Sequence, residues 1–89
     1  MLIKDSITTI VPVLLQHDRL YALNETLSRI PSGNNIVIVD SGDPDLLPLI
    51  DQSNVKKLIY REQNLGQWET RREGLAHVDT EYVHFLDAD

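Results

Sequence analysis

The sequence contains no cysteine and no apolar run long enough to cross a bilayer. Without cysteine there are no disulfide bonds or thiolate metal sites, and the composition fits a reducing compartment. The most apolar stretch, residues 7–15, is shorter than the ~20 residues of a membrane-spanning helix and is rich in β-branched side chains. No positively charged segment with a small-residue cleavage site precedes it. We therefore expect a cytoplasmic protein without a membrane span.

Basic residues are scarce as well. Eight Lys and Arg stand against 14 Asp and Glu, which gives a formal net charge of -6 at pH 7. The basic residues form no cluster that could neutralise a run of phosphates, so we expect no nucleic-acid partner. A chain of 89 residues makes at most one small domain. It has no internal repeat and no linker that would divide it.

Four short apolar runs predict β-strands at residues 7–13, 36–39, 55–60 and 82–86. The first two are apolar almost throughout, which is typical of strands buried on both faces of a parallel sheet. Helix-like stretches alternate with the strands, and short connections of this kind give right-handed crossovers. The pattern predicts an α/β fold with a half-Rossmann parallel sheet of about four strands and helices on its faces.

Three helices are expected between these strands. The first follows Asp18 as its N-cap and carries apolar residues at three- and four-residue steps up to residue 30. The second is short and follows Asp43 as its cap. The third covers residue 67 to about residue 78, with Trp68 packed against the sheet.

Acidic residues follow two of the predicted strands. Asp40 ends the second strand, and Asp87 and Asp89 follow the fourth. Because the carboxyl ends of parallel strands share the edge where ligands bind, we expect these carboxylates to converge. They suit a hard divalent cation, Mg²⁺ or Mn²⁺, carried in with a diphosphate. Taken alone, an Asp-x-Asp triplet is more often solvated surface than a metal site.

Two further features belong to the same edge. The tripeptide Asp40-Ser41-Gly42 can contact a nucleobase or a ribose, and it can equally be an ordinary turn into the next helix. On the third helix, one of Arg71 and Arg72 can pair with a diphosphate oxygen. At least one of the two is expected to pair with a neighbouring acid such as Glu69 on the exposed face.

The order of the motifs is more specific than any one of them. Along the chain they are Ile10-Val11-Pro12-Val13 before a helix, residues 36–42 with Asp45 shortly after, Asn64-Leu65-Gly66 with Arg71 and Gly74-Leu75, and residues 81–89. This set resembles the N-terminal half of family 2 glycosyltransferases of the GT-A fold. The resemblance implies that residues 1–89 form the nucleotide-sugar-binding subdomain. It also implies truncation after the DXD motif, without the acceptor-binding half.

The resemblance implies a role for the residues at the nucleoside end of the site. Pro12 and Val13 would border the nucleoside. Asp40 would read the base, commonly uracil, and it is followed by Ser41 where the family often has a second Asp. The implied partner is a nucleotide-diphosphate sugar.

At the diphosphate end, the resemblance implies that Arg71 lies near the phosphates. Asp87 and Asp89 would be the DXD motif, which contacts the ribose and a divalent metal, Mn²⁺ or Mg²⁺. The general base that deprotonates the acceptor hydroxyl would lie beyond Asp89, so no catalytic residue is assigned and the fragment is expected to be inactive alone.

Two other interpretations of the acidic strand end stay open. An apolar strand that ends in Asp-x-Asp also resembles the nucleophile strand of haloacid-dehalogenase-like phosphohydrolases, although there the motif opens the domain. The chain can also be a non-enzymatic α/β module that binds Mg²⁺. In every case the fourth strand leaves a sheet edge open, and we expect this edge to form a homodimer.

Overall fold

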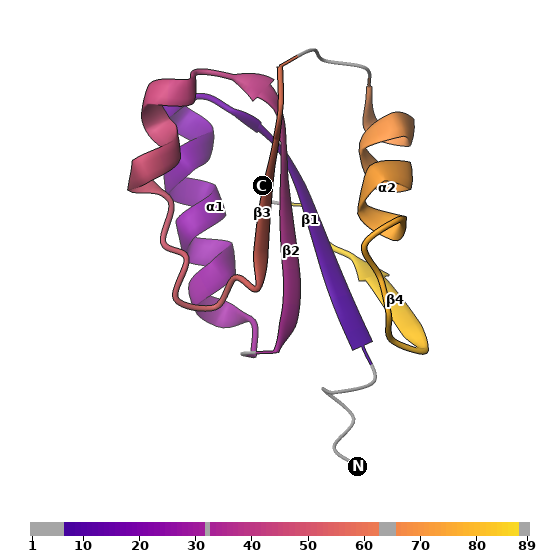
Figure 1. Ribbon diagram of the computed structural model, residues 1–89. Coiled ribbons are helices and arrows are strands. Elements are labelled where there is room, and N and C mark those ends of the chain that lie inside the picture. Colours follow the sequence, from indigo (N-terminus) through magenta and orange to yellow (C-terminus); the bar gives the residue numbers. More distant parts are fainter. Residues whose placement is uncertain (1–6, 32, 63–65, 88–89) are drawn as a thin grey trace.

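The computed structural model describes residues 7–31, 33–62 and 66–87 (Figure 1). Its elements in chain order are β1 (Ile7–Leu15), α1 (His17–Arg29), β2 (Asn34–Gly42), the 3-10 helix η2 (Pro44–Leu49), β3 (Lys57–Arg61), α2 (Gln67–Leu75) and β4 (Tyr82–Phe85). All strand pairs are parallel, and the order across the sheet is β3-β2-β1-β4. The predicted α/β fold with a four-stranded half-Rossmann sheet is confirmed.

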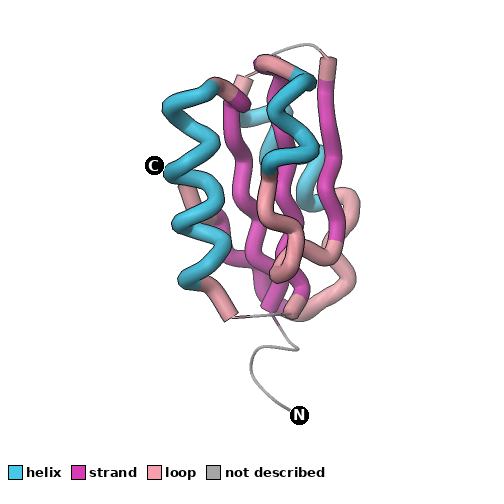
Figure 2. The backbone as a smooth tube through the Cα atoms, turned by 90° about the vertical axis from the view of Figure 1, so that its left-hand side faces the viewer, coloured by secondary structure: helices cyan, strands magenta, loops and turns pink. Residues whose placement is uncertain are grey.

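The sheet separates two helical layers. α1 and η2 cover one face, and α2 covers the other (Figures 1 and 2). Side-chain alternation along the strands divides the core accordingly. The buried cluster on the α1 side comprises Val11, Val13, Leu15, Leu23, Leu27, Val37, Val39, Leu46 and Ile50, and the cluster on the α2 side comprises Ile10, Ile36 and Ile38. Burial on both faces explains why the central strands are apolar almost throughout.

A bulge ends the pairing of β1 with β2. The register is regular up to Val13 and then shifts, so that Leu15 pairs with Gly42. Gly42 has φ +102°, and a Cβ atom there would lie 2.1 Å from the backbone oxygen of Leu15. Ser41 has φ 67°. Only glycine fits position 42, and its conformation turns the chain out of the sheet toward η2.

The predicted helix starts had different outcomes. Asp43 caps η2, because its Oδ1 accepts a hydrogen bond from the backbone N–H of Asp45 at 3.0 Å. The prediction that Asp18 caps the first helix was wrong. β1 runs on to Leu15, α1 begins at His17, and Gln16 takes the N-cap position without a side-chain hydrogen bond. Asp18 lies in the first turn, where its charge favours the helix dipole.

The prediction that Trp68 packs against the sheet was also wrong, since the residue is 77% exposed. α2 instead covers the sheet through the buried residues Thr70 and Gly74. A Cβ atom on Gly74 would lie 2.8 Å from Cγ2 of Ile10, so the helix backbone sits directly on the core. Trp68 stands two residues before Thr70, about 200° away around the helix, so it lies on the side of α2 that faces solvent. α2 also ends at Leu75, three residues earlier than predicted.

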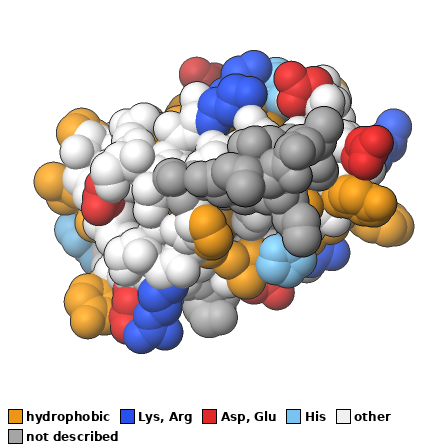
Figure 3. All heavy atoms as spheres, turned by 90° about the horizontal axis from the view of Figure 1, so that it is seen from below, with side chains coloured by type: hydrophobic (Ala, Val, Ile, Leu, Met, Phe, Trp, Pro, Cys, Tyr) orange, Lys and Arg blue, Asp and Glu red, His pale blue; other side chains and the backbone are white. Residues whose placement is uncertain are grey.

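The end of the molecule where the strands begin carries charged side chains of both signs and apolar side chains (Figure 3). Lys and Arg side chains are dispersed there among acidic and apolar ones (Figure 3). No helix in the described part of the chain has the length and apolar character needed to cross a membrane.

Candidate functional site

The carboxyl ends of the strands form the edge of the sheet that lies opposite the amino terminus (Figure 1). Asp40 lies near the end of β2, and Arg61 is the last residue of β3. After β4 the chain continues through Leu86, whose N–H donates to the backbone oxygen of Ile10 at 3.0 Å, into Asp87. Ligands of open parallel sheets bind at this edge.

Arg71 and Asp87 meet at the end of β4. Nη2 of Arg71 lies 3.7 Å from Oδ1 of Asp87, and its guanidinium carbon lies 5.5 Å from the centroid of the Phe85 ring. A separation of 3.7 Å makes an ion pair but not a hydrogen bond. Nε of Arg71 is buried without a hydrogen-bond partner among the described residues. Both charged groups therefore keep hydrogen-bonding capacity for a ligand.

Arg72 points away from this pair. Its Nη1 lies 3.1 Å from Oε1 of Glu69 on the exposed side of α2. The two adjacent arginines thus have different surroundings, and Arg71 is the one that faces the strand ends.

Asp40 is the last residue of β2 whose side chain lies on the same face of the sheet as α2. The residue is 8% exposed, and its Oδ1 has no hydrogen-bond partner in the described part of the chain. Ser41 next to it is partly buried and has a left-handed backbone. That conformation is uncommon for a non-glycine residue and tends to occur at functional sites.

Pro12 and Val13 face opposite sides of β1. Pro12 is partly buried and stands opposite Ile38, on the α2 side. Val13 is buried in the α1-side cluster, so its side chain is committed to the core. Of these two predicted nucleoside neighbours, Pro12 is the one on the face that carries Asp40.

Asp40 and Asp87 follow strands that end at the same edge, as predicted, but these strands are not neighbours. β4 pairs with the far side of β1, so two strand spacings, about 10 Å, separate β2 from β4. Within residues 7–31, 33–62 and 66–87, no group of three or more His, Asp or Glu side chains could hold a metal. Asp89, the other predicted metal ligand, and Asn64-Leu65 lie outside the described residues.

Arg61 was not predicted from the sequence. It stands directly opposite Asp40 in the register of β2 and β3, and its Nη1 is buried without a hydrogen-bond partner among the described residues. Arg61 could have been selected from the sequence because it ends an apolar run, which is the property that led to the selection of Asp40.

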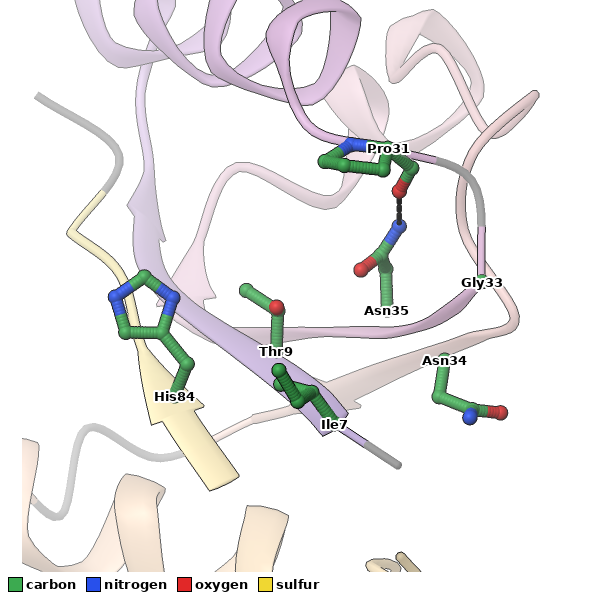
Figure 4. A pocket seen from close by; sticks show the side chains of 7 residues that line it. All are labelled: Ile7, Thr9, Pro31, Gly33, Asn34, Asn35 and His84. Carbon is green, nitrogen blue, oxygen red and sulfur yellow. Dashed lines mark hydrogen bonds between the residues drawn. The ribbon is translucent and has the colours of Figure 1, made fainter. Parts of the chain in front are cut away.

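A separate pocket of about 210 Å³ opens at the opposite end of the sheet, on the α1 side (Figure 4). His84 of β4 and Thr9 of β1 are register partners on one wall. Across from them, Nδ2 of Asn35 donates to the backbone oxygen of Pro31 at 2.9 Å. The pocket lies at the strand beginnings and is not part of the Arg71–Asp87 site.

A half-Rossmann sheet with an acidic strand end is compatible with several nucleotide-binding families. The sequence model described as Glycosyl transferase family 2 matches residues 8–89, which is nearly the whole chain. The chain belongs to glycosyl transferase family 2. No curated protein and no solved structure matches it significantly.

Membership of glycosyl transferase family 2 confirms the resemblance and supports a role in glycosyl transfer. The match covers all four strands apart from Ile7 and continues through the acidic strand end. It therefore favours the transferase over the phosphohydrolase and over the Mg²⁺-binding module.

Glycosyl transferase family 2 also implies a divalent metal, and the chemistry of the edge fits one. The side chain of Asp87 is 66% exposed, so its carboxylate is accessible. Mg²⁺ is typically held by one or two carboxylates together with waters and substrate phosphates. Asp87 would be one of the carboxylates that hold such a metal.

Proposed function

We propose that residues 1–89 form the nucleotide-sugar-binding subdomain of a glycosyltransferase that moves a sugar from a uridine diphosphate sugar to an acceptor hydroxyl. The observation that carries this proposal is the pairing of Arg71 with Asp87 at the end of β4. Their charged groups lie 3.7 Å apart and offer a cation to a diphosphate and an anion to a metal. Family membership supplies the reaction class.

The nucleoside occupies the other part of the edge in this proposal. Asp40, nearly buried at the end of β2, accepts a hydrogen bond from the N–H of the base ring. Pro12 of β1 borders the ribose between the base and the phosphates. The positive φ of Ser41 and Gly42 bends the backbone away at the end of β2, where it leaves room for the nucleoside.

At the diphosphate, Asp87 holds the metal, with Asp89 as the second carboxylate of the motif. When bound, the metal stabilises the negative charge that develops on the leaving diphosphate. Arg71 donates charge-assisted hydrogen bonds to the phosphate oxygens. The Phe85 ring beside it restricts the orientation of the guanidinium.

Transfer also requires a base that deprotonates the acceptor hydroxyl. We expect this base outside residues 1–89. The subdomain then binds the donor without turning it over.

A thermal-unfolding titration with UDP, with Mn²⁺ and with both tests the donor site. At about 100 times the dissociation constant, the complex adds about 2.7 kcal/mol of stability, or a shift of roughly 10–20 °C. We expect the shift to require both ligands and to disappear in Asp87→Asn. Asp79→Asn, an equivalent change at the other end of the sheet, should keep it. A wild-type chain that does not respond to UDP with Mn²⁺ would contradict the proposal.

We also propose that the open edge of β4 pairs with a second copy of the chain. Because the N–H of Leu86 donates to Ile10 of β1, strand alternation directs the N–H groups of Val83 and Phe85 away from β1. Tyr82 on the same strand is 62% exposed. A strand edge of this kind is a template for pairing.

A further inference from the structure

Arg61 and Asp40 are neighbours on one face of the sheet. They are register partners in the parallel pair of β3 and β2, so their side chains project to the same side. That side is the α2 side, because Ile38 and Ile59, each two residues earlier, pack in the α2-side cluster. A guanidinium and a carboxylate thus stand next to each other at the carboxyl ends of two adjacent strands.

These two groups do not satisfy each other. Oδ1 of Asp40 and Nη1 of Arg61 are both buried, and neither has a hydrogen-bond partner within the described residues. Asp40 is more than nine-tenths buried as a residue. An unmatched buried donor or acceptor costs free energy that a suitable ligand group would recover. The pair is therefore arranged to receive one group that donates and one that accepts.

We propose that Arg61 is a specificity-determining residue that reads the nucleobase together with Asp40. Asp40 accepts the ring N–H, and Arg61 donates to the ring carbonyl next to it. This inference rests on the proposed function, which places the base at the end of β2. The chemistry recognised is a ring N–H flanked by a carbonyl, as in uracil and guanine. The corresponding ring nitrogen of cytosine carries no proton, and a carboxylate opposite it is repulsive.

The strand order separates Arg61 from the phosphates. β3 and β4 are the two edges of the sheet, three strand spacings or about 14 Å apart. A diphosphate held by Arg71 and Asp87 therefore lies beyond the reach of Arg61. The part of a nucleotide that extends from β4 across β1 to β2 and β3 is its base.

Calorimetric titrations separate contacts to the base from contacts to the phosphates. The ligands are UDP, GDP, CDP and inorganic diphosphate, each with Mg²⁺. The chains are the wild type, Arg61→Met, Arg61→Lys and the control Lys57→Met, which removes an exposed cation from the other end of β3. Thermal unfolding of each variant checks its fold. If Arg61→Met does not fold, Arg61→Lys serves as the test variant, because it keeps a positive charge and a hydrogen-bond donor but loses the planar guanidinium.

We expect Arg61→Met to weaken UDP binding by about 10- to 100-fold, the range for a hydrogen bond from a charged group. Diphosphate binding should change by less than about twofold, Arg61→Lys should lose less than Arg61→Met, and Lys57→Met should bind like the wild type. UDP should bind the wild type more tightly than CDP, and a wild type that binds GDP more tightly than UDP would keep this inference but contradict the uridine of the proposed function.

Three results would overturn this inference. They are an unchanged UDP affinity in Arg61→Met, an equal loss for UDP and diphosphate, and a wild type that binds CDP as well as UDP and GDP. The first two leave the proposed function intact, because the wild type still binds UDP. A wild type that binds none of the three nucleotides would instead refute the proposed function, and this inference with it.

Discussion

Nη2 of Arg71 lies 3.7 Å from Oδ1 of Asp87, so an ion pair joins α2 to the chain just after β4. The two side chains are 30% and 66% exposed, and water screens a pair of this kind. Such pairs contribute about 0–1 kcal/mol to stability. The ion pair itself therefore adds little to the stability of the fold.

Replacing Arg71 should separate binding from stability. We expect Arg71→Met to change the free energy of unfolding by no more than about 1 kcal/mol. UDP affinity in the presence of Mn²⁺ should fall by about 10- to 100-fold, because a charged donor to the phosphate is lost. Urea unfolding and calorimetry measure the two quantities. The control Arg72→Met removes an arginine that pairs with Glu69, and an equal loss of affinity there would contradict the assignment.

Gly42→Ala should be more damaging than Gly66→Ala. Both glycines have positive φ, and the strain on alanine in such a backbone is about 1–3 kcal/mol. At Gly42 the new Cβ would also lie 2.1 Å from the backbone oxygen of Leu15, whereas nothing lies within 4 Å of the one at Gly66. We expect a loss of at least about 3 kcal/mol for Gly42→Ala by urea denaturation. Equal losses in the two variants would show that the contact with Leu15 relaxes without cost.

Gly74→Ala should destabilise the chain although alanine favours helices. The helix gains about 1 kcal/mol, but the added Cβ would lie 2.8 Å from Cγ2 of Ile10 and 2.9 Å from Cδ1 of Ile38. Overpacking a core costs about 1–3 kcal/mol, so we expect a net loss. An Ile10→Ala background removes the contacts with Ile10 and leaves the one with Ile38, so adding Gly74→Ala there should cost clearly less than in the wild type. A loss of the same size in both backgrounds would exclude the contacts with Ile10 as the cause.

Asp51 gives a prediction about pH. The backbone N–H of Ser53 at 3.1 Å, followed by its hydroxyl at 2.8 Å, lowers the pKa of Asp51 below the usual 3.8. Because the folded-state pKa is the lower one, the stabilisation is present above pH 3.8 and is lost as the pH falls through the folded-state pKa.

Ser53→Ala removes the hydroxyl donor and keeps the backbone N–H. We expect it to raise the pKa of Asp51 part of the way toward 3.8, as measured by an NMR titration of the carboxyl carbon. Ser28→Ala serves as a control, because that hydroxyl donates to the backbone oxygen of Glu25 in α1. An Asp51 titration that is identical with and without the Ser53 hydroxyl would show that the backbone bond acts alone.

If β4 pairs with a second copy of the chain, the protein forms a dimer. A charged residue introduced on β4 should weaken this dimer. Light scattering over a range of concentrations should show the dimer for the wild type. Tyr82→Lys should shift it toward monomer, because a lysine on an edge strand opposes pairing. Tyr21→Lys makes the same change at an exposed tyrosine of α1 and should leave the dimer intact. A wild type that is monomeric at every concentration would refute the pairing.

Local sequence signals predicted the elements well. β1 and β2 follow from apolar runs, and the start of η2 follows from Asp43 before Pro44. The errors came where tertiary packing decided the outcome. Trp68 is apolar and lies in a helix, yet it projects into solvent because Thr70 and Gly74 face the sheet and Trp68 is on the other side of α2.

The candidate site was predicted residue by residue but not as an arrangement. Asp40 and Asp87 could be selected from strand ends, whereas side-chain chemistry left Arg71 and Arg72 as alternatives and only the family resemblance favoured Arg71. The position of β4 beside β1 could not, because short apolar strands do not encode which neighbour they pair with. That position keeps Asp40 apart from Asp87 and brings Arg71 to Asp87.

The sequence alone determined the parallel α/β class, the order of its elements and the family, because hydrophobic periodicity and motif order are properties of the chain itself. Only the tertiary structure decided which arginine of α2 faces the strand ends and that Arg61 stands beside Asp40. Strand order, register and the depth of helix packing are set by contacts between residues far apart in the chain. A linear pattern does not carry that information.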